Sequence, residues 1–321
     1  MEHPRPAREV PLERLLELVQ MVRRELVLRE ESPTGDWVEE TAQGLHSGAQ
    51  AGWCYPSPEA DGLAFFSTRA GAAFGHVHVG GGPGALARAT KLAETLIDQL
   101  APDIRSVDLG FTGLTTDDDH SLLSTLAQRP GSFVIEREAM ERALGPADAE
   151  PPARPAPDML HVAIRDVTLD ALAHLDVRAF QGSTDELLIG HEVADYRRVL
   201  ETLLGGGMGR FLDEASTALI EPHPTRLIGA ILSSEQSPRR AVFLDFMVDP
   251  ERRGRGYGRY LLRWGLRALW ALGYERVRLW VTVSNGPARH LYDELGFRRT
   301  ATAMIYRWER PSSTPHPQAP R

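Results

Sequence analysis

The chain is poor in cysteine, and Cys54 is the single one in the sequence. One thiol excludes an intramolecular disulfide and a cysteine-rich metal site. A lone cysteine next to Trp53 and Tyr55 is typical of a packed, inert side chain, with a reactive thiol as the alternative. This usage fits a reducing, cytoplasmic setting, which is the location we expect.

Long apolar runs are also missing. No stretch approaches the ~20 apolar residues that a membrane-spanning helix needs. The first ten residues are polar and contain proline, so they do not resemble a signal peptide. We therefore expect no membrane partner.

The sequence has no excess of positive charge, because 36 basic side chains face 44 acidic ones and the net charge is −8. Nucleic-acid affinity rests on phosphate neutralisation, so this balance predicts no nucleic-acid partner. It is compatible with a cationic substrate. The histidines are scattered, and the close pair His76 and His78 has no evident third ligand, so we predict no metal.

Length and proline content predict two domains. A chain of 321 residues exceeds the usual size of one domain. Residues 145–158 are rich in Pro and Ala and read as a linker, whereas residues 310–321, with four prolines, read as a disordered tail. The expected domains are residues 1–144 and 159–309.

A glycine-rich turn in the second half is the most informative local feature. It joins an apolar strand, Ala241 to Val248, to a helix expected over Arg259 to Leu272. Gly254, Gly256 and Gly258 carry no Cβ, so the backbone can turn sharply and present N–H groups to an anion. The unpaired N–H groups of the next helix point at the same place, which predicts a phosphate-binding turn.

The spacing within this turn distinguishes between phosphate-binding motifs. The chain reads R-x-x-G-x-G from Arg253 to Gly258, which matches neither G-x-G-x-x-G nor a P-loop ending in G-K-[ST]. A strand over 276–283 follows, then S-N-G-P at 284–287 and a short helix up to L-G-F at 295–297.

This succession resembles the GNAT-type N-acetyltransferases over residues 242–308. The resemblance implies an α/β (α+β) domain with a mixed, mostly antiparallel sheet flanked by helices. The rest of the second half agrees with that order, with helices expected over 169–180 and 185–204 and strands over 160–164, 217–221, 227–233 and 300–308.

The first half repeats the same order of elements. A strand over 74–79 and a glycine-rich turn at 80–84 precede a helix over 85–100; strands over 104–111 and 132–136 flank a helix capped by Asp119. We therefore expect two tandem GNAT-like domains, with a degenerate N-terminal copy. Its turn lacks arginines, and Leu123 falls about where Tyr292 falls in the second half. A generic α/β domain is the alternative.

The resemblance implies acetyl-coenzyme A as co-substrate and a set of residues that contact it. The implied contacts are the backbone of Met247 and Val248 for the pantetheine arm, the turn residues Arg253, Gly254, Arg255, Gly256, Tyr257 and Gly258 for the pyrophosphate, and Asn285 for the pantetheine region. Asn285 precedes Pro287, so a helix N-cap is an alternative role.

Two catalytic candidates follow. The resemblance implies that Tyr292 donates a proton to the departing thiolate, whereas Ala288, Leu291 and Leu295 form the apolar face of its helix; a packed tyrosine is the alternative. Asp245 is the carboxylate nearest to the implied open strand edge. Strand alternation places it opposite its neighbours Leu244 and Phe246, an arrangement that a bulge could reverse.

The acceptor side is least defined by the sequence. In the resembling family the segment between the first two helices selects the acceptor, and here it contains Asp185, Glu186 and His191. An acidic surface suits an amine, whereas a solvated loop is the alternative. We expect an N-acetyltransferase whose C-terminal domain acts on a small-molecule or peptide amine in a ternary complex, as a monomer or homodimer. The alternative is a non-catalytic acyl-coenzyme A sensor or regulatory protein.

Overall fold

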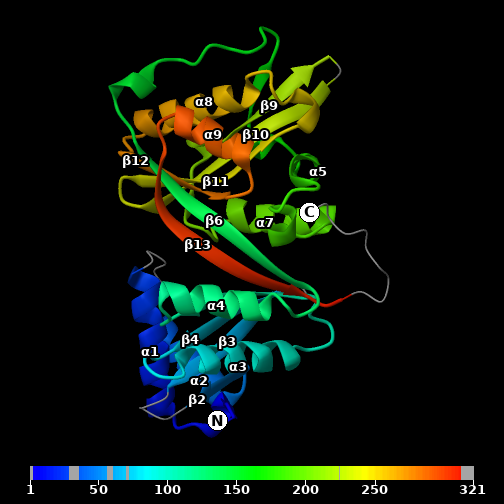
Figure 1. The fold of residues 1–321 in the computed structure, drawn as a ribbon. Helices are drawn as coiled ribbons and strands as arrows, with labels where there is room; N and C mark the ends of the chain where they lie inside the picture. Colours follow the sequence, from blue (N-terminus) through cyan, green and yellow to red (C-terminus); the bar gives the residue numbers. More distant parts are fainter. Residues whose placement is uncertain (1–2, 29–35, 56–60, 70–71, 224, 312–321) are drawn as a thin grey trace. The chain divides into compact units, whose positions relative to one another are not determined.

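A computed structural model describes residues 3–28, 36–55, 61–69, 72–223 and 225–311. The chain forms two compact units, Met1–Ile135 with Met304–Arg321, and Glu136–Ala303 (Figure 1). Strand β6 (Ser132–Ala143) therefore begins in the first unit and ends in the second, and β13 (Arg298–Glu309) does the reverse.

The first unit has a sheet in the order β1-β2-β3-β4-β5, next to which the end of β13 pairs with β5. Helices α3 and α4 pack against one hydrophobic core and α1 and α2 against another. The elements are β1 (Arg5–Pro6), η1 (Ala7–Glu9), α1 (Leu12–Leu28), α2 (Trp37–Ser47), β2 (Gly52–Tyr55), β3 (Gly62–Arg69), β4 (Ala72–Val79), α3 (Ala85–Asp98), β5 (Ser106–Thr112) and α4 (Thr116–Leu126).

In the first unit, the Arg88 side chain binds the glycine-rich turn at residues 80–84. The Arg88 guanidinium donates to the carbonyls of Gly80 and Pro83 at 2.8 and 3.0 Å. It also donates to the carbonyl of Asp61 at 3.3 Å. Leu123 is buried in the core, as expected of a copy without the site tyrosine.

The second unit has a sheet in the order β6-β12-β11-β10-β9-β7, with β8 beside β10. Its elements are η2 (Pro146–Ala149), β7 (Leu160–Ala163), η3 (Ile164–Asp166), α5 (Leu169–Phe180), α6 (Glu186–Ile189), α7 (Val193–Leu204), β8 (Arg210–Phe211), η4 (Asp213–Ala215), β9 (Thr217–Pro222), β10 (Thr225–Ser237), β11 (Arg240–Val248), η5 (Pro250–Arg252), α8 (Tyr257–Ala271), β12 (Arg276–Thr282) and α9 (Gly286–Glu294).

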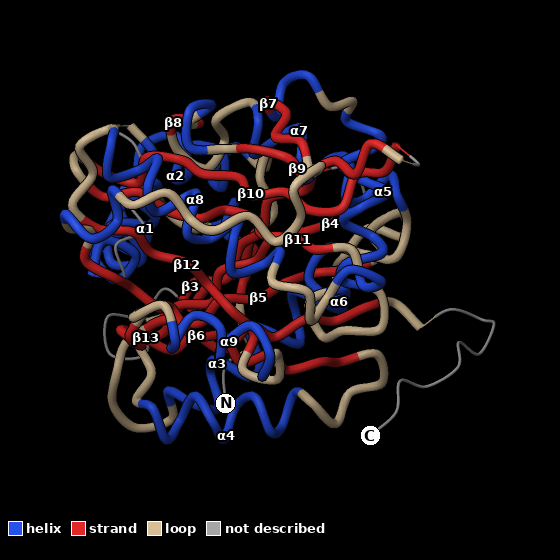
Figure 2. Tube along the Cα trace, turned by 90° about the horizontal axis from the view of Figure 1, so that it is seen from above, coloured by secondary structure: helices blue, strands red, loops and turns tan. Residues whose placement is uncertain are grey.

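Helices cover both faces of this second sheet. Alternation along β10 sends Ile231 into a core with α8 and α9, and Ala230 and Leu232 into a core with α5 and α7. Strands β11 and β12 pair in parallel, whereas β9, β10 and β11 pair antiparallel. The mixed, mainly antiparallel sheet with flanking helices confirms the predicted fold class. Figure 2 shows the strands in red and the helices in blue.

Several element boundaries differ from the sequence-based expectation. Strand β6 continues beyond residue 136 to Ala143, because its second half pairs along β12. The helix expected over 185–204 is split into α6 and α7 at Gly190, whose φ of 127° favours glycine. The N-cap of α4 is Thr115, whose hydroxyl accepts from the Asp118 N–H, rather than Asp119.

The compact units do not coincide with the ranges 1–144 and 159–309, which stay a proposal for the domains. The interval 145–158 contains the short η2 turn. Of the predicted tail, Arg310 donates to the carbonyls of Ile104 and Ala101, and residues 312–321 lie outside the described residues.

Candidate active site

A gap between two parallel strands forms the floor of the site. Strands β11 and β12 pair only from Arg240 to Val242, opposite Arg276 to Arg278. Both strands then continue without pairing to each other, β11 to Val248 and β12 to Thr282. A cleft of about 940 Å³ opens there, lined by the unpaired parts of both strands and by α8 and α9. The splayed edge that the resemblance implied is thus present.

A bulge in β11 decides which way Asp245 faces. Leu232 pairs with Asp245 and Ser233 with Phe243, so Leu244 is an extra residue in β11. Phe243 and Phe246 pack with the α8 core, whereas Leu244 packs with the α5 core. Asp245 shares the α5 side with Leu244 and stays opposite Phe246. The bulge therefore turns this carboxylate towards α5 and the cleft.

The end of β11 offers backbone groups to the cleft at alternate residues. The Asp249 N–H donates to the carbonyl of Ile228 on β10 at 2.9 Å. Because neighbouring peptide groups of a strand point to opposite sides, the Met247 N–H also faces β10 and the Val248 N–H faces the open edge. The Met247 side chain is buried in the α5 core. Of this predicted pair, only Val248 lines the cleft.

The glycine-rich turn leads directly from this edge into α8. Gly254 and Gly256 have φ of 74° and 86°, and Gly256 is the N-cap of α8. The first helical N–H with a backbone acceptor is that of Tyr260, which donates to the Gly256 carbonyl at 3.0 Å. The earlier N–H groups have no acceptor one turn back. A Cβ on Gly258 would lie 3.3 Å from the Phe246 ring, so a larger residue there would press against that ring.

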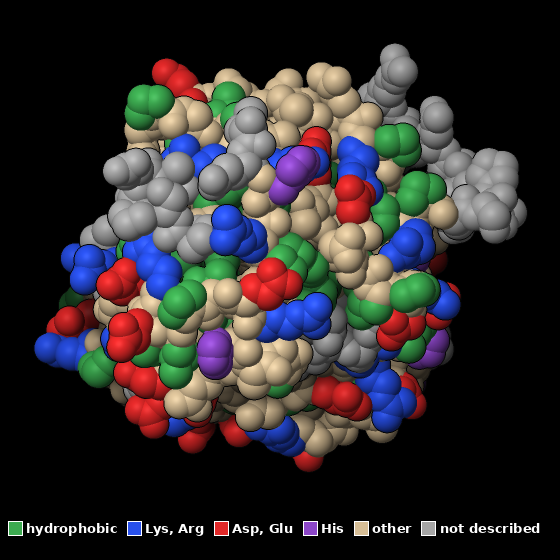
Figure 3. All heavy atoms as spheres, turned by 90° about the horizontal axis from the view of Figure 1, so that it is seen from below, with side chains coloured by type: hydrophobic (Ala, Val, Ile, Leu, Met, Phe, Trp, Pro, Cys, Tyr) green, Lys and Arg blue, Asp and Glu red, His purple; other side chains and the backbone are tan. Residues whose placement is uncertain are grey.

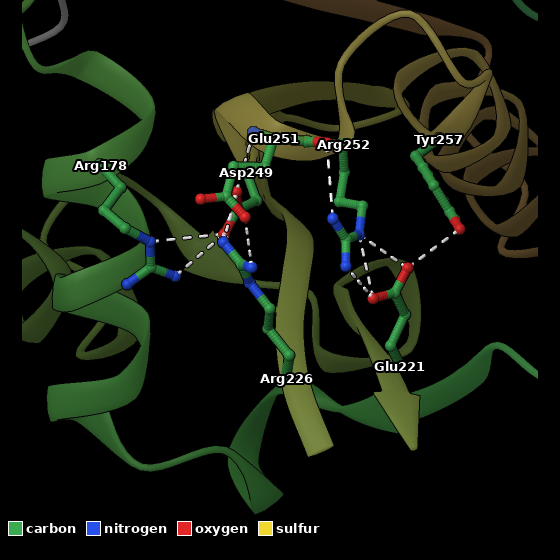
Figure 4. Close-up of polar contacts among 7 residues, drawn as sticks. All are labelled: Arg178, Glu221, Arg226, Asp249, Glu251, Arg252 and Tyr257. Carbon is green, nitrogen blue, oxygen red and sulfur yellow. Dashed lines mark hydrogen bonds and ion pairs between the residues drawn. The ribbon is translucent and has the colours of Figure 1, made fainter. Parts of the chain in front are cut away.

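Two ion-pair clusters hold this turn in place, as Figure 4 shows. Asp249 is buried, and its carboxylate accepts from Arg226 at 2.9 and 3.0 Å and from Arg178 at 3.3 Å (Figure 4). Burial raises the pKa of Asp249, but hydrogen bonds from Arg226 and the Glu251 N–H and the charges of both arginines outweigh it and hold the pKa below its ordinary value.

The second cluster joins the turn to β9. Arg252 donates to both carboxylate oxygens of Glu221, at 2.6 to 2.9 Å, and the Tyr257 hydroxyl donates to the same carboxylate at 3.3 Å (Figure 4). These donors, Arg252 first, lower the pKa of Glu221. The Arg253 guanidinium donates to the Ala179 carbonyl at the end of α5. These contacts occupy Arg252 and Arg253 with the protein itself, which leaves the backbone amides of the turn to bind an anion.

Tyr292 lies at the inner end of the cleft. Its ring is buried and packs against Phe246 and Phe297, with centroids 6.3 and 5.9 Å away. It is thus the buried residue of α9, whereas Ala288 and Leu291 are only partly buried. Burial, and then the charges of nearby carboxylates, raise the pKa of the phenol, so it is protonated at neutral pH. Among the described residues its hydroxyl has no hydrogen-bond partner, which leaves it free to donate into the cleft.

Two acidic side chains, Asp185 and Asp245, lie beside Tyr292, and a third adjoins Asp245. Asp185 accepts from the Thr282 hydroxyl and from the Asn285 amide, the latter at 3.4 Å. Asn285 also caps α9 by accepting from the Ala288 N–H at 3.3 Å, so it both caps the helix and lines the cleft. Asp245 accepts from the Phe246 N–H at 2.7 Å. The third, Asp176, lies behind Asp245 on α5 and is fully buried.

The two adjoining carboxyls perturb each other. Burial raises the pKa of Asp245 to about 6, against hydrogen bonds from the Phe246 N–H and from Asp176. Burial and the neighbouring Asp245 raise the pKa of Asp176 well above its ordinary value. A carboxyl with a pKa of about 6 is mostly ionised at pH 7 and is a stronger base than an ordinary aspartate, so it is suited to accept a proton from an ammonium group.

Arg137 of β6 is a cation within this acidic group. Its guanidinium lines the cleft and donates to the Trp280 carbonyl at 3.2 Å. Burial lowers its pKa, and the charges of Asp185, Tyr292 and Asp245 oppose that effect. Within the described part of the chain, Arg137 makes no ion pair shorter than 4.0 Å.

The structure brings most of the predicted site residues together at one cleft. Those lining it are Asp185, Asp245, Val248, Arg253, Gly254, Gly256, Tyr257, Gly258, Asn285 and Tyr292. Those that do not line it are Met247, Arg255, Glu186 and His191. Glu186 instead accepts from the Gly182 N–H at 2.7 Å, and its other carboxylate oxygen lies 3.1 Å from Nδ1 of His191. Glu186 thus contacts the segments on both sides of α6.

Sequence reasoning missed Asp176 and Arg137. Asp176 had a signal, because it occupies the helical face of Leu172 and Ala179, where a carboxylate is out of place. Arg137 had none, because residues 137–143 read R-E-A-M-E-R-A, and such pairs of charged and apolar residues suit several structures.

The segment that contains most of the site residues is similar to known proteins. Residues 174–297 match the acetyltransferase (GNAT) family. Two mycothiol acetyltransferases are similar to this chain. The one from Thermobispora bispora is 37% identical to it over 99 residues, and the one from Propionibacterium freudenreichii is 30% identical to it over 148 residues. These matches cover 31% and 46% of this chain, and the chain spans 33% and 46% of the lengths of the two relatives.

Solved structures of similar fold extend over both units. A GCN5-related N-acetyltransferase from Sphaerobacter thermophilus has a TM-score of 0.60 and 17% identity, with 94% of each chain covered. A tandem GNAT protein from the clavulanic acid biosynthesis pathway has a TM-score of 0.55 and 16% identity, and covers 97% of this chain and 99% of its own. Residues 174–297 are thus similar to the GNAT family, and the fold of the chain is similar to that of a tandem GNAT protein.

None of the described helices combines the length and apolar composition that a membrane crossing requires. In that same part of the chain, no three His, Cys, Asp or Glu side chains gather as a metal site. On the face drawn in Figure 3, acidic and basic side chains are interspersed.

Proposed function

We propose that the chain is an N-acetyltransferase that moves an acetyl group from acetyl-coenzyme A to an amine, and that the second unit carries out the reaction. The observation that carries this proposal is the cleft between β11 and β12, where an anion-binding turn, a free phenol and a partly ionised carboxyl converge. The acceptor is a small-molecule or peptide amine. The names of the curated relatives support a small acceptor.

The residues fit the donor in two ways. The turn from Gly254 to Gly258 presents unpaired amides and the N-terminus of α8, which favour the pyrophosphate. The open edge at Val248 offers backbone groups to the amides of the pantetheine arm. Because acetyl-coenzyme A supplies the acetyl thioester, the remaining tasks are to deprotonate the amine and protonate the thiolate.

Asp245 and Tyr292 would divide these two tasks. Asp245 takes the proton of the acceptor ammonium, which is otherwise neutral in only about one molecule in a thousand at pH 7. The amine then attacks the thioester directly, in a ternary complex. Tyr292 donates its proton as the carbon–sulfur bond breaks and is restored by the proton that the acceptor nitrogen loses. The free Tyr292 hydroxyl favours catalysis over the alternative of a non-catalytic sensor.

A pair of matched glycine variants tests where the donor binds. Gly256→Ala adds a Cβ at positive φ inside the turn, whereas Gly273→Ala adds one at a similar φ of 83° beyond the other end of α8, in open space. We expect Gly256→Ala to weaken acetyl-coenzyme A binding by at least about tenfold in calorimetry and Gly273→Ala to leave it unchanged. Equal binding by both variants, or none by the parent protein, would contradict the proposal.

Turnover is then measured with a panel of small-molecule and peptide amines. Acetyl-coenzyme A binding without turnover of any amine in the panel would favour the sensor instead.

A further inference from the structure

Asp176 is a fully buried acidic side chain behind the cleft. It projects from α5 into the core formed with α7 and β10, and its exposed fraction is 0%. Both carboxyl oxygens are enclosed, and no N–H or O–H donor of the described residues reaches them. The carboxyl of Asp245, which the β11 bulge turns towards α5, is the ionisable group that adjoins it. A buried carboxylate without any donor is unfavourable by several kilocalories, so this arrangement requires a proton.

The positions of the two groups indicate which one holds that proton. Asp245 accepts the Phe246 N–H and faces the charge of Arg137, both of which favour its ionised form. Asp176 has no such support. A protonated Asp176 donates its O–H to Asp245, which turns two repelling charges into a hydrogen bond to a single charge.

Other ionisable groups face the pair from every neighbouring element. Tyr196 of α7 and Tyr292 of α9 are neutral phenols, and the Tyr196 hydroxyl is enclosed without a partner among the described residues. Asp185 adds a negative charge and Arg137 of β6 a positive one. Their charges oppose each other, so the pair itself decides its protonation.

We propose that Asp176 and Asp245 share one proton and act as a single base, in which Asp245 contacts the acceptor amine and Asp176 is a positioning residue that donates a hydrogen bond to it. This inference rests on the proposed function. The pair starts with one proton and one negative charge. It takes one proton from the acceptor ammonium, becomes neutral while the free amine attacks, and later loses that proton to solvent. The second nitrogen proton replaces the one that Tyr292 gives to the thiolate.

An infrared measurement tests the pair without any turnover. In protein labelled with carboxyl-¹³C aspartate, the C=O stretch of a protonated carboxyl is separate from carboxylate bands. The spectrum is recorded at pH 8, where Asp108, whose pKa burial raises to about 6, is ionised. We expect a protonated-carboxyl band in the parent protein that Asp176→Asn abolishes. The matched control is Asp170→Asn, which changes an exposed residue of the same helix and should keep the band.

Kinetics supply a second test, through the acid side of the pH profile of kcat/KM. Asp176→Asn keeps a donor to Asp245, so we expect its acid limb within about half a pH unit of the parent's. Asp176→Ala removes the donor, which should move the limb up by about one unit, a tenfold change in proton affinity. A residue that only fills space would leave the acid limb in place in both variants, with Ala reducing stability through the cavity that it leaves.

The outcomes separate the two proposals. Absence of the band in the parent, its persistence in Asp176→Asn, or identical acid limbs in Asn and Ala variants would overturn the shared proton. If no amine is turned over, the proposed function fails, and the infrared band of the parent protein alone decides whether the pair holds a proton.

Discussion

Tyr292 combines a buried ring with a hydroxyl that is free to donate. Replacing it by phenylalanine removes the proton donor and keeps the packing against Phe246 and Phe297. We expect turnover in Tyr292→Phe to fall by about a hundredfold or more, because general acid catalysis contributes that much, with acetyl-coenzyme A affinity unchanged. Steady-state kinetics and calorimetry measure the two effects. Tyr274→Phe, which removes a buried phenol hydrogen-bonded to Glu235, is the control and should keep full turnover.

The same side chain sets an expectation for alkaline pH. Because the folded protein raises the pKa of Tyr292 above its ordinary value of about 10, the phenol remains an acid throughout the neutral and mildly alkaline range. Loss of kcat as the pH rises from 8 to about 9.5, absent from Tyr292→Phe, would contradict this protonation state.

Single residues were predictable from the sequence where a motif carried them. Tyr292 and Asn285 follow from S-N-x-x-A-x-x-L-Y, and both line the cleft. The bulge at Leu244 and the contact between Asp176 and Asp245 depend on strand register and on helix packing across the sheet, which single-residue patterns do not contain. The direction in which Asp245 faces was accordingly left open by the sequence.

Among the elements, the turn after β11 depends most on buried charge. The side chain of Asp249 is 1% exposed and pairs with Arg226 and Arg178. Asp249→Ala would leave two guanidinium groups without their partner, so we expect a loss of about 3–5 kcal/mol in the free energy of unfolding, measured with urea. Asp213→Ala, which breaks an exposed pair with Arg165, should cost less than about 1 kcal/mol. Similar losses in the two variants would show that the buried cluster is not needed.

Acid should reproduce part of that loss. The folded pKa of Asp249 lies below its unfolded value, so its contribution is complete above the unfolded pKa of about 4 and is lost as the pH falls through the folded pKa. Unfolding measured between pH 5 and pH 2.5 should therefore show a smaller pH dependence in Asp249→Ala than in the parent protein. The same dependence in both proteins would exclude the pairing.

At this scale the sequence predicted the site better than its surroundings. The strand 241–248 and the strand 276–283 match β11 and β12 to within one residue, because glycines and apolar runs bound them. The helix start at Arg259 was two residues late, since Gly256 and not Gly258 is the cap. The second half of β6 was missed, because Glu138 and Glu141 are charged residues that only their arginine partners in the second unit make compatible with burial.

At the scale of the whole molecule, the second unit includes the end of β6, which lies before the predicted linker in the sequence. Strand β6 pairs with β12 from Arg137 to Ala143 and places Met140 in the α8 core. We expect residues 136–303 to fold and bind acetyl-coenzyme A, and residues 159–303, which lack β6, to do neither. Circular dichroism and calorimetry decide. Binding by the shorter chain would show that β6 and Arg137 are dispensable.

The division of the chain also constrains the order in which its parts can fold. The strand segment Tyr306–Glu309 pairs with β5 in the first unit, and Tyr306 and Trp308 lie in that unit's core. A ribosome makes these residues after the entire second unit. The first unit therefore leaves the ribosome with β5 unpaired along one edge, and it can be completed only after the second unit has been made. Strand β13 thus completes the first unit, although it is made after the second.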